Sequence, residues 1–166
     1  MDISSPLFLF LFLVLSVFFL QKKGVRVCVI DDNDFCREFI MFKISEVLDD
    51  KSQVDGVGTS AQTALTHLMN DACAAYDLVL VDMSMPMDMD NTKGQNENER
   101  AGLWVVSQYK AKRPESNTKF MCLSGMGQDP NSIARCKDAG FSPPYALGKP
   151  VEWGIMTKIL KSLKKV

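Results

Sequence analysis

The chain has 166 residues, of which 46% are hydrophobic and 23% charged, and its formal net charge at pH 7 is −1. This is the composition of one ordinary globular domain, large enough to fold without disulfides or a structural metal. A charge so close to zero does not favour a nucleic-acid partner, and none is expected. The single histidine, His67, excludes zinc sites built from several histidines and falls inside a predicted helix.

The cysteines are odd in number and contain no C-x-x-C pair, which predicts reduced, mostly buried thiols in a reducing compartment. They are Cys28, Cys36, Cys73, Cys122 and Cys136.

A hydrophobic leader opens the chain. Residues 7–20 are apolar except for Ser16, and Lys22 and Lys23 follow. As a helix this run would span about 21 Å, short of the roughly 30 Å hydrocarbon core of a bilayer. Three interpretations stay open: a membrane anchor that leaves the rest of the chain facing the cytosol, a gene-model artefact from an upstream start, or a cleaved signal peptide. We therefore divide the chain into a leader at 1–23 and a domain at 24–166.

Within the domain, short apolar runs alternate with amphipathic stretches. Strands are predicted at 25–30, 54–59, 78–81, 119–123 and 145–147, and helices at 34–48, 60–75, 102–110, 129–139 and 151–163. Asn33 or Asp34 could cap the first helix, and Asp129 followed by Pro130 opens the fourth. The polar segment at about 83–101 lacks an apolar period and predicts a long mobile loop. The alternation predicts an α/β fold with a parallel sheet and helices on both faces, and no further domain after the last helix.

Polar residues end four of the predicted strands. Ligands of open parallel sheets bind outside the carboxyl ends of the strands, so these residues are the candidate site: Asp31, Asp32, Asp82, Ser124 and Lys149. Clustered carboxylates repel one another unless a proton or a cation holds them together, and oxygen ligands suit Mg²⁺. A carboxylate can attack a phosphoryl group, whose oxygens then need positive charge and hydrogen-bond donors.

Four strings carry a resemblance to a known family. They are IDDN at 30–33, LVLVDMSMP at 78–86, CLSG at 122–125 and GKP at 148–150. In this order, each closing a predicted strand, they resemble the receiver domain of two-component response regulators over about residues 25–163. The resemblance implies a flavodoxin-like, doubly wound sheet of five parallel strands in the order 2-1-3-4-5.

The resemblance also implies a function. Asp82 would accept a phosphoryl group from a phosphohistidine on a histidine kinase or a histidine phosphotransfer protein, and the chain would catalyse only its own phosphorylation and dephosphorylation. Asp32, Asp82 and the main-chain carbonyl of Ser84 would bind Mg²⁺ directly, with Asp31 acting through water. Ser124 and Lys149 would contact the phosphoryl group. The MSMP string and the stand-alone layout resemble single-domain plant regulators of a multistep phosphorelay, which signal by docking an unknown downstream protein in the cytosol or nucleus.

Two features depart from the family pattern. The glycine that opens the third helix, Gly102, lies twenty positions after Asp82, which leaves room for an insertion of roughly a dozen residues beside the site. The aromatic residue that the family places three positions before the lysine is Ala146 here. Tyr145 is adjacent, but strand alternation would put it on the opposite face. The resemblance further implies a cis peptide bond between Lys149 and Pro150.

Two other functions remain as alternatives. A degenerate receiver could serve as an interaction module that needs no phosphorylation, although the presence of Asp32, Asp82 and Lys149 argues against it. A flavodoxin-like cofactor-binding protein is less favoured, because acidic strand ends repel the phosphate of a flavin when no metal is present.

Overall fold

The structure is a computed structural model that describes residues 24–58, 60–70, 76–87, 97–98, 100–125 and 129–164. The hydrophobic leader, Cys73 and residues 88–96 of the predicted loop lie outside the described residues. Among the helices formed by the described residues, none combines the length and the apolar character needed to cross a bilayer.

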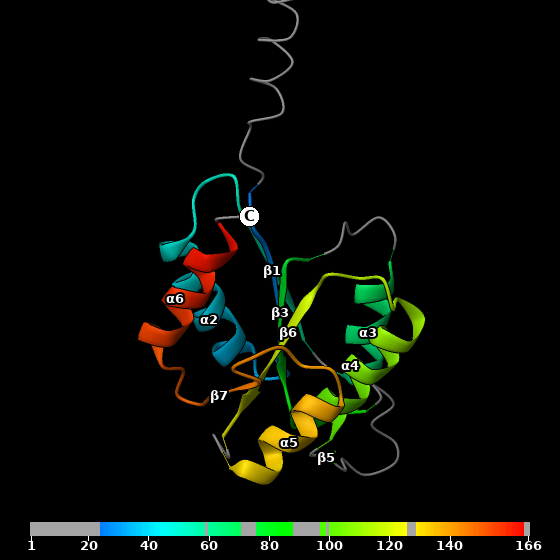
Figure 1. Cartoon of the computed structure of the whole chain (residues 1–166). Coiled ribbons are helices and arrows are strands. Elements are labelled where there is room, and N and C mark those ends of the chain that lie inside the picture. The colour runs from blue at the N-terminus through cyan, green and yellow to red at the C-terminus, as the bar shows by residue number, and fades with distance from the viewer. Residues whose placement is uncertain are drawn as a thin grey trace, which may run out of the picture.

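The described elements follow the predicted alternation (Figure 1). In chain order they are β1 (Arg26–Ile30), α2 (Asp34–Val47), β2 (Gln53–Val57), α3 (Ala61–Met69), β3 (Leu78–Asp82), β4 (Met85–Pro86), β5 (Glu97–Asn98), α4 (Ala101–Lys112), β6 (Lys119–Ser124), α5 (Pro130–Asp138), β7 (Ala146–Gly148) and α6 (Trp153–Leu163). The main sheet has the order β2-β1-β3-β6-β7, and every neighbouring pair in it is parallel. The predicted sheet and its strand order are confirmed.

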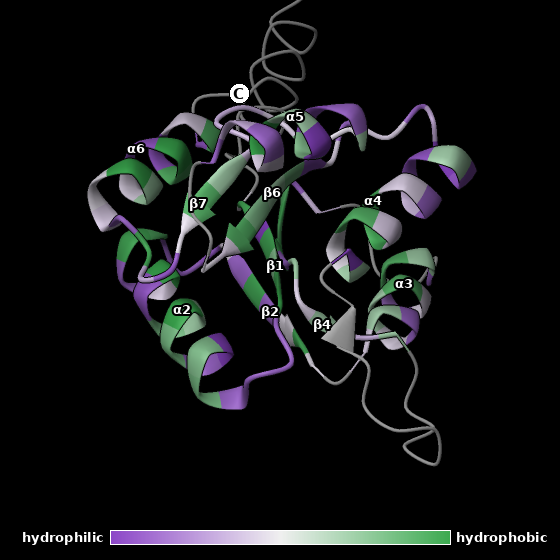
Figure 2. Ribbon diagram, turned by 90° about the horizontal axis from the view of Figure 1, so that it is seen from below, coloured by the Kyte–Doolittle hydropathy of each residue, from purple (hydrophilic) through white to green (hydrophobic). Residues whose placement is uncertain are grey.

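Helices cover both faces of the sheet. Viewed toward the strand ends, α2 and α6 lie on one side and α3 and α4 on the other, with the strands between them (Figure 2). Two clusters of buried residues correspond to these faces, and α5 contributes Cys136 to the cluster on the α3 and α4 side. β3 lies at the centre of the sheet and is buried on both faces, which explains why its sequence is continuously apolar rather than alternating.

Side-chain caps start three helices, and the caps of α2 and α5 are at predicted residues. The side chains of Asn33, Ser60 and Asp129 accept hydrogen bonds from backbone N–H groups in the first turns of α2, α3 and α5. Each of these oxygens satisfies a donor that would otherwise lack an intrahelical partner.

The segment after β3 differs from the predicted loop. Met85 and Pro86 pair in antiparallel fashion with Asn98 and Glu97, so a short ribbon closes the base of the segment. Met85 is 1% exposed and packs in the core on the α3 and α4 side, which fixes the first strand of this ribbon. Two-residue strands leave no periodic pattern in a sequence, so the ribbon was not predicted.

The expectation for Tyr145 was wrong. Tyr145 precedes β7 rather than belonging to it, and its φ is 69°. Strand alternation therefore does not apply, and the Tyr145 side chain packs against the same core cluster as Ala146. The Lys149–Pro150 bond is cis, as expected, and the Pro143–Pro144 bond is cis as well.

Helix α4 begins directly against the end of β3. A Cβ atom added to Gly102 would lie 2.4 Å from the carbonyl oxygen of Asp82, and the Gly102 N–H donates a hydrogen bond to the carbonyl of Met83. Only a residue without a Cβ allows this approach. Gly102 therefore packs against the end of β3, although it lies twenty positions after Asp82 in the chain.

This contact gives a test of the fold. Gly102→Ala forces backbone apart at the end of β3, and we expect a loss of about 1–3 kcal/mol in the free energy of unfolding, measured by denaturant titration. Gly154→Ala is the matched control, because nothing lies within 4 Å of its added Cβ and the position is helical. The control should be neutral or gain up to about 1 kcal/mol. Equal effects of the two substitutions would contradict the close approach.

Candidate functional site

The predicted site residues meet at the carboxyl edge of the sheet. Asp31 directly follows β1, while Asp82 ends β3 and Ser124 ends β6. Oxygen atoms of Asp31, Asp32 and Asp82 all lie within 4.8 Å of one another. Two strand ends that are distant in sequence, those of β1 and β3, thus place three carboxylates in one small volume, as parallel strands require.

Lys149 joins two of these carboxylates. Its Nζ lies 2.9 Å from Oδ2 of Asp31 and 2.9 Å from Oδ2 of Asp82. The Asp31 side chain is fully buried and the Asp82 side chain is 10% exposed. The backbone positions the lysine, because the Lys149 N–H donates to the Ser124 carbonyl and the cis proline follows.

Burial and charge act on the acid–base properties of this pair. Burial is the largest effect on the pKa of Asp82 and raises it, and the negative charge of Asp31 raises it further. The hydrogen bond from Lys149 lowers this pKa, but the net result lies above the ordinary value. Burial lowers the pKa of Lys149, but its hydrogen bonds to Asp31 and Asp82 outweigh that effect and leave the pKa raised. The lysine is therefore held in its charged form.

Backbone contacts fix the orientation of Asp31. Its Oδ1 accepts a hydrogen bond from the Asn33 N–H at 3.0 Å, so both carboxylate oxygens have partners. Arg37 of α2 donates from Nη1 to the Asp31 carbonyl at 2.8 Å and is paired with Asp34. Sequence reasoning missed Arg37, because an arginine on an amphipathic helix carries no signal of a contact with a strand end.

The carboxylates suit a magnesium ion. Asp31 and Asp82 are buried, Asp32 is partly exposed, and all three offer oxygen atoms only. Mg²⁺ prefers such oxygen ligands and keeps several waters, which the partial exposure of Asp32 permits. The Ser84 N–H approaches Oδ1 of Asp82 at 3.4 Å, so the loop that holds the predicted carbonyl ligand lies beside the Asp82 carboxylate.

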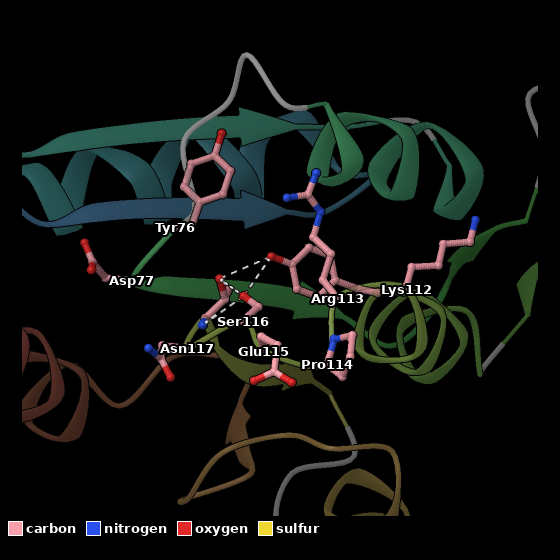
Figure 3. A pocket seen from close by; sticks show the side chains of 10 residues that line it. Tyr76, Asp77, Lys112, Arg113, Pro114, Glu115, Ser116 and Asn117 are labelled. Atoms are coloured by element: carbon pink, nitrogen blue, oxygen red, sulfur yellow. Dashed lines mark hydrogen bonds between the residues drawn. The ribbon is translucent and has the colours of Figure 1, made fainter.

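A hollow at the opposite edge of the sheet does not bring carboxylates together in this way. Its volume is about 650 Å³, and it is lined by the loop after α4 and the start of β3. The hydroxyl groups of Tyr109, Ser116 and Thr118 bond to one another. In Figure 3, Asp77 and Lys112 point away from Ser116. Its polar groups serve the fold, and the acidic edge remains the candidate site.

The raised pKa of Asp82 predicts a pH dependence of stability. The folded state binds a proton at Asp82 more tightly than the unfolded chain does, so this carboxyl destabilises the fold as the pH rises above about 3.9. In metal-free buffer, Asp82→Asn should therefore increase the free energy of unfolding at pH 7, and this gain should shrink as the pH falls toward about 3.9 and be absent below it.

Asp49→Asn is a control of opposite sign. The hydrogen bond from Ser52 lowers the pKa of Asp49, so its contribution is present at pH 7 and is lost in acid. Denaturant titrations from pH 3 to pH 7 measure both variants. A loss of stability in Asp82→Asn at pH 7 would contradict the assigned direction.

Comparison with known proteins confirms the fold. No protein-family model matches the chain, and no curated protein matches it either. Solved structures do match. A receiver domain from Methylobacillus flagellatus superposes with a TM-score of 0.62 at 22% identity, covering 84% of this chain and 98% of its own. The signal receiver domain of a DNA-binding response regulator from Colwellia psychrerythraea gives a TM-score of 0.64 at 14% identity, covering 86% and 99%.

A third match extends the same conclusion. The signal receiver domain of an HD domain-containing protein from Pseudomonas fluorescens superposes with a TM-score of 0.61 at 18% identity, covering 86% of this chain and 88% of its own. The three proteins share the sheet and its helices with this chain at low sequence identity. The chain therefore has the fold of response regulator receiver domains.

Proposed function

We propose that this chain is a phosphorelay receiver in which Asp82 accepts a phosphoryl group from a phosphohistidine. The observation that supports this function best is the position of Lys149, whose ammonium lies 2.9 Å from Oδ2 of Asp31 and from Oδ2 of Asp82. A cation held between a buried acid and a reachable one can neutralise negative charge that arrives at the second. Passive strand-end turns would not need a lysine contributed by a distant loop.

The chemistry follows from the residues present. An oxygen of the Asp82 carboxylate attacks phosphorus, the phosphorus–nitrogen bond of the donor breaks, and the imidazole keeps the electron pair and takes up a proton. Lys149 pairs with the transferred phosphoryl oxygens, and the hydroxyl of Ser124 donates a hydrogen bond to them from the neighbouring strand end. A magnesium ion held by Asp31, Asp32, Asp82 and the Ser84 carbonyl would supply further positive charge there.

The surface beside Lys149 suggests how a donor protein docks. Phe35 and Phe39 on α2 are 79% and 46% exposed, and their rings stack on each other. Phe39 also meets the Trp153 ring edge-on. With Pro150, Val151 and Lys149 they line an apolar groove of about 150 Å³. Exposed aromatic side chains in contact with a groove indicate a binding surface rather than a solvated face.

The groove leads to the acceptor, because Lys149 both lines it and contacts Asp82. A protein that presents a phosphohistidine must rest on the rim of the site while its imidazole reaches the carboxylate. We propose that a helix of a histidine phosphotransfer protein or a histidine kinase lies in this groove with an aliphatic side chain one turn from its histidine.

The phosphorylation reaction is the first test. Full-length protein incubated with acetyl phosphate and Mg²⁺ should gain one phosphate, measured by intact mass. The adduct should be absent in Asp82→Asn and with EDTA, and Lys149→Met should slow its formation about 10²-fold because one charged donor is lost.

The exposed turn residue Asp50 provides the control, since Asp50→Asn should label like the parent. A parent chain that gains no adduct from any donor would instead support an interaction module that needs no phosphorylation.

Docking has a separate test. Phe35→Ser should slow phosphoryl transfer from a phosphorylated histidine phosphotransfer protein at least tenfold, while labelling by acetyl phosphate stays unchanged because a small donor needs no groove. Phe42→Ser is the matched control: Phe42 is 60% exposed on the same helix but does not line the groove. Equal slowing in the two variants would reject the groove and leave the phosphorylation itself untouched.

A further inference from the structure

Two cysteines meet between the sheet and α5. Cys122 lies in β6 and Cys136 in α5, with exposures of 1% and 0%. Both are free thiols, and their side chains hydrogen-bond to each other. They belong to the same core cluster. Isolated buried cysteines are ordinary core residues, but two thiols in direct contact from different elements have a chemistry available to neither alone.

Backbone hydrogen bonds fix the positions of both cysteines. The Phe141 N–H donates to the carbonyl of Cys136 at 3.0 Å, and the Cys122 N–H donates to the carbonyl of Tyr145 at 2.9 Å. The chain between α5 and β7 thus binds both cysteine backbones. A bond between the sulfurs would link groups that the fold already places side by side.

Helix α5 depends on this contact for its attachment. Of its nine residues, only Ser132 and Cys136 are buried. An element with so few buried groups opens at lower cost than the core strands do. When α5 is packed on the sheet, the hydrogen bond to Cys136 and burial raise the pKa of Cys122, while the same hydrogen bond lowers the pKa of Cys136. Burial of both sulfur atoms shields the pair from external reagents while α5 is packed on the sheet.

We propose that Cys122 and Cys136 form a reversible disulfide, an oxidation site that fixes α5 to β6. The oxidant is a small disulfide of the glutathione class. One cysteine thiolate attacks its sulfur and releases one thiol, and the second cysteine then attacks the mixed disulfide and releases the other. The two protein thiols are oxidised, the external disulfide is reduced to two thiols, and the two protons pass to those thiols. This inference is independent of phosphoryl transfer.

The site of the bond gives it a consequence. Cys122 lies two residues before Ser124 on β6, so a covalent link would hold the helix beside the strand that ends at the acidic site. Oxidation would restrict the motion of α5 without adding charge or bulk to the surface.

The test uses the full-length chain carrying Cys36→Ser and Cys73→Ser, which leaves only the buried thiols Cys28, Cys122 and Cys136. Incubation of the folded protein with glutathione disulfide, followed by alkylation and peptide mass mapping, should give a Cys122–Cys136 cross-link that dithiothreitol reverses. Amide hydrogen exchange across α5 should slow about tenfold in the oxidised form.

Variants separate this site from general thiol oxidation. Cys136→Ala and, independently, Cys122→Ala should abolish the cross-link, and Cys28→Ala should leave it unchanged. The proposal is overturned if the cross-link forms only after unfolding in guanidinium, if Cys28 enters a disulfide equally fast, or if oxidation leaves exchange in α5 unaltered. Even if an alanine variant fails to fold, the peptide map of the chain that carries Cys36→Ser and Cys73→Ser still shows whether the Cys122–Cys136 cross-link forms.

Discussion

The site depends on one shared ion pair, in which the Lys149 ammonium lies between the carboxylates of Asp31 and Asp82. Two acids so close and so shielded from water would repel strongly if both were ionised without a counter-charge. The lysine offsets that repulsion and is itself kept charged by the two acids. Removing the lysine would cost more than removing one partner of a surface ion pair, because the two acids would be left without a counter-charge.

The parallel sheet is what makes this pair possible. Asp31 and Lys149 are separated by 118 positions in the chain, yet the carboxyl ends of β1 and β7 lie at the same edge. Every parallel connection returns the chain through a helix, so each strand end is free to present a short loop there. The central strand β3 supplies rigidity through its fully buried side chains, and the candidate site is confined to residues that end the strands or follow them.

The predictions from sequence succeeded where local patterns decide the structure and failed where distant contacts decide it. Strand ends were predictable because apolar runs stop abruptly at polar residues such as Asp31 and Asp82. The periodicity of α2 identified a helix but not its buried face: Ile40 and Ile44 enter the core, while the phenylalanines stay exposed. Tyr145 adopts a positive φ that its residue type disfavours, which no propensity would suggest. The contact from Arg37 likewise depends on where the helix packs.

The ribbon formed by β4 and β5 has a consequence for how this chain can vary. Because Met85 and Pro86 pair with Asn98 and Glu97, the two ends of the intervening segment are held together by backbone hydrogen bonds and a buried methionine. The entropy of closing a loop grows only slowly with its length, so the segment could lengthen or shorten at small cost. The ribbon thus allows the insertion to change in length without a change in the position of Gly102. It is a natural place for grafting a foreign sequence beside the acidic edge without displacing α4.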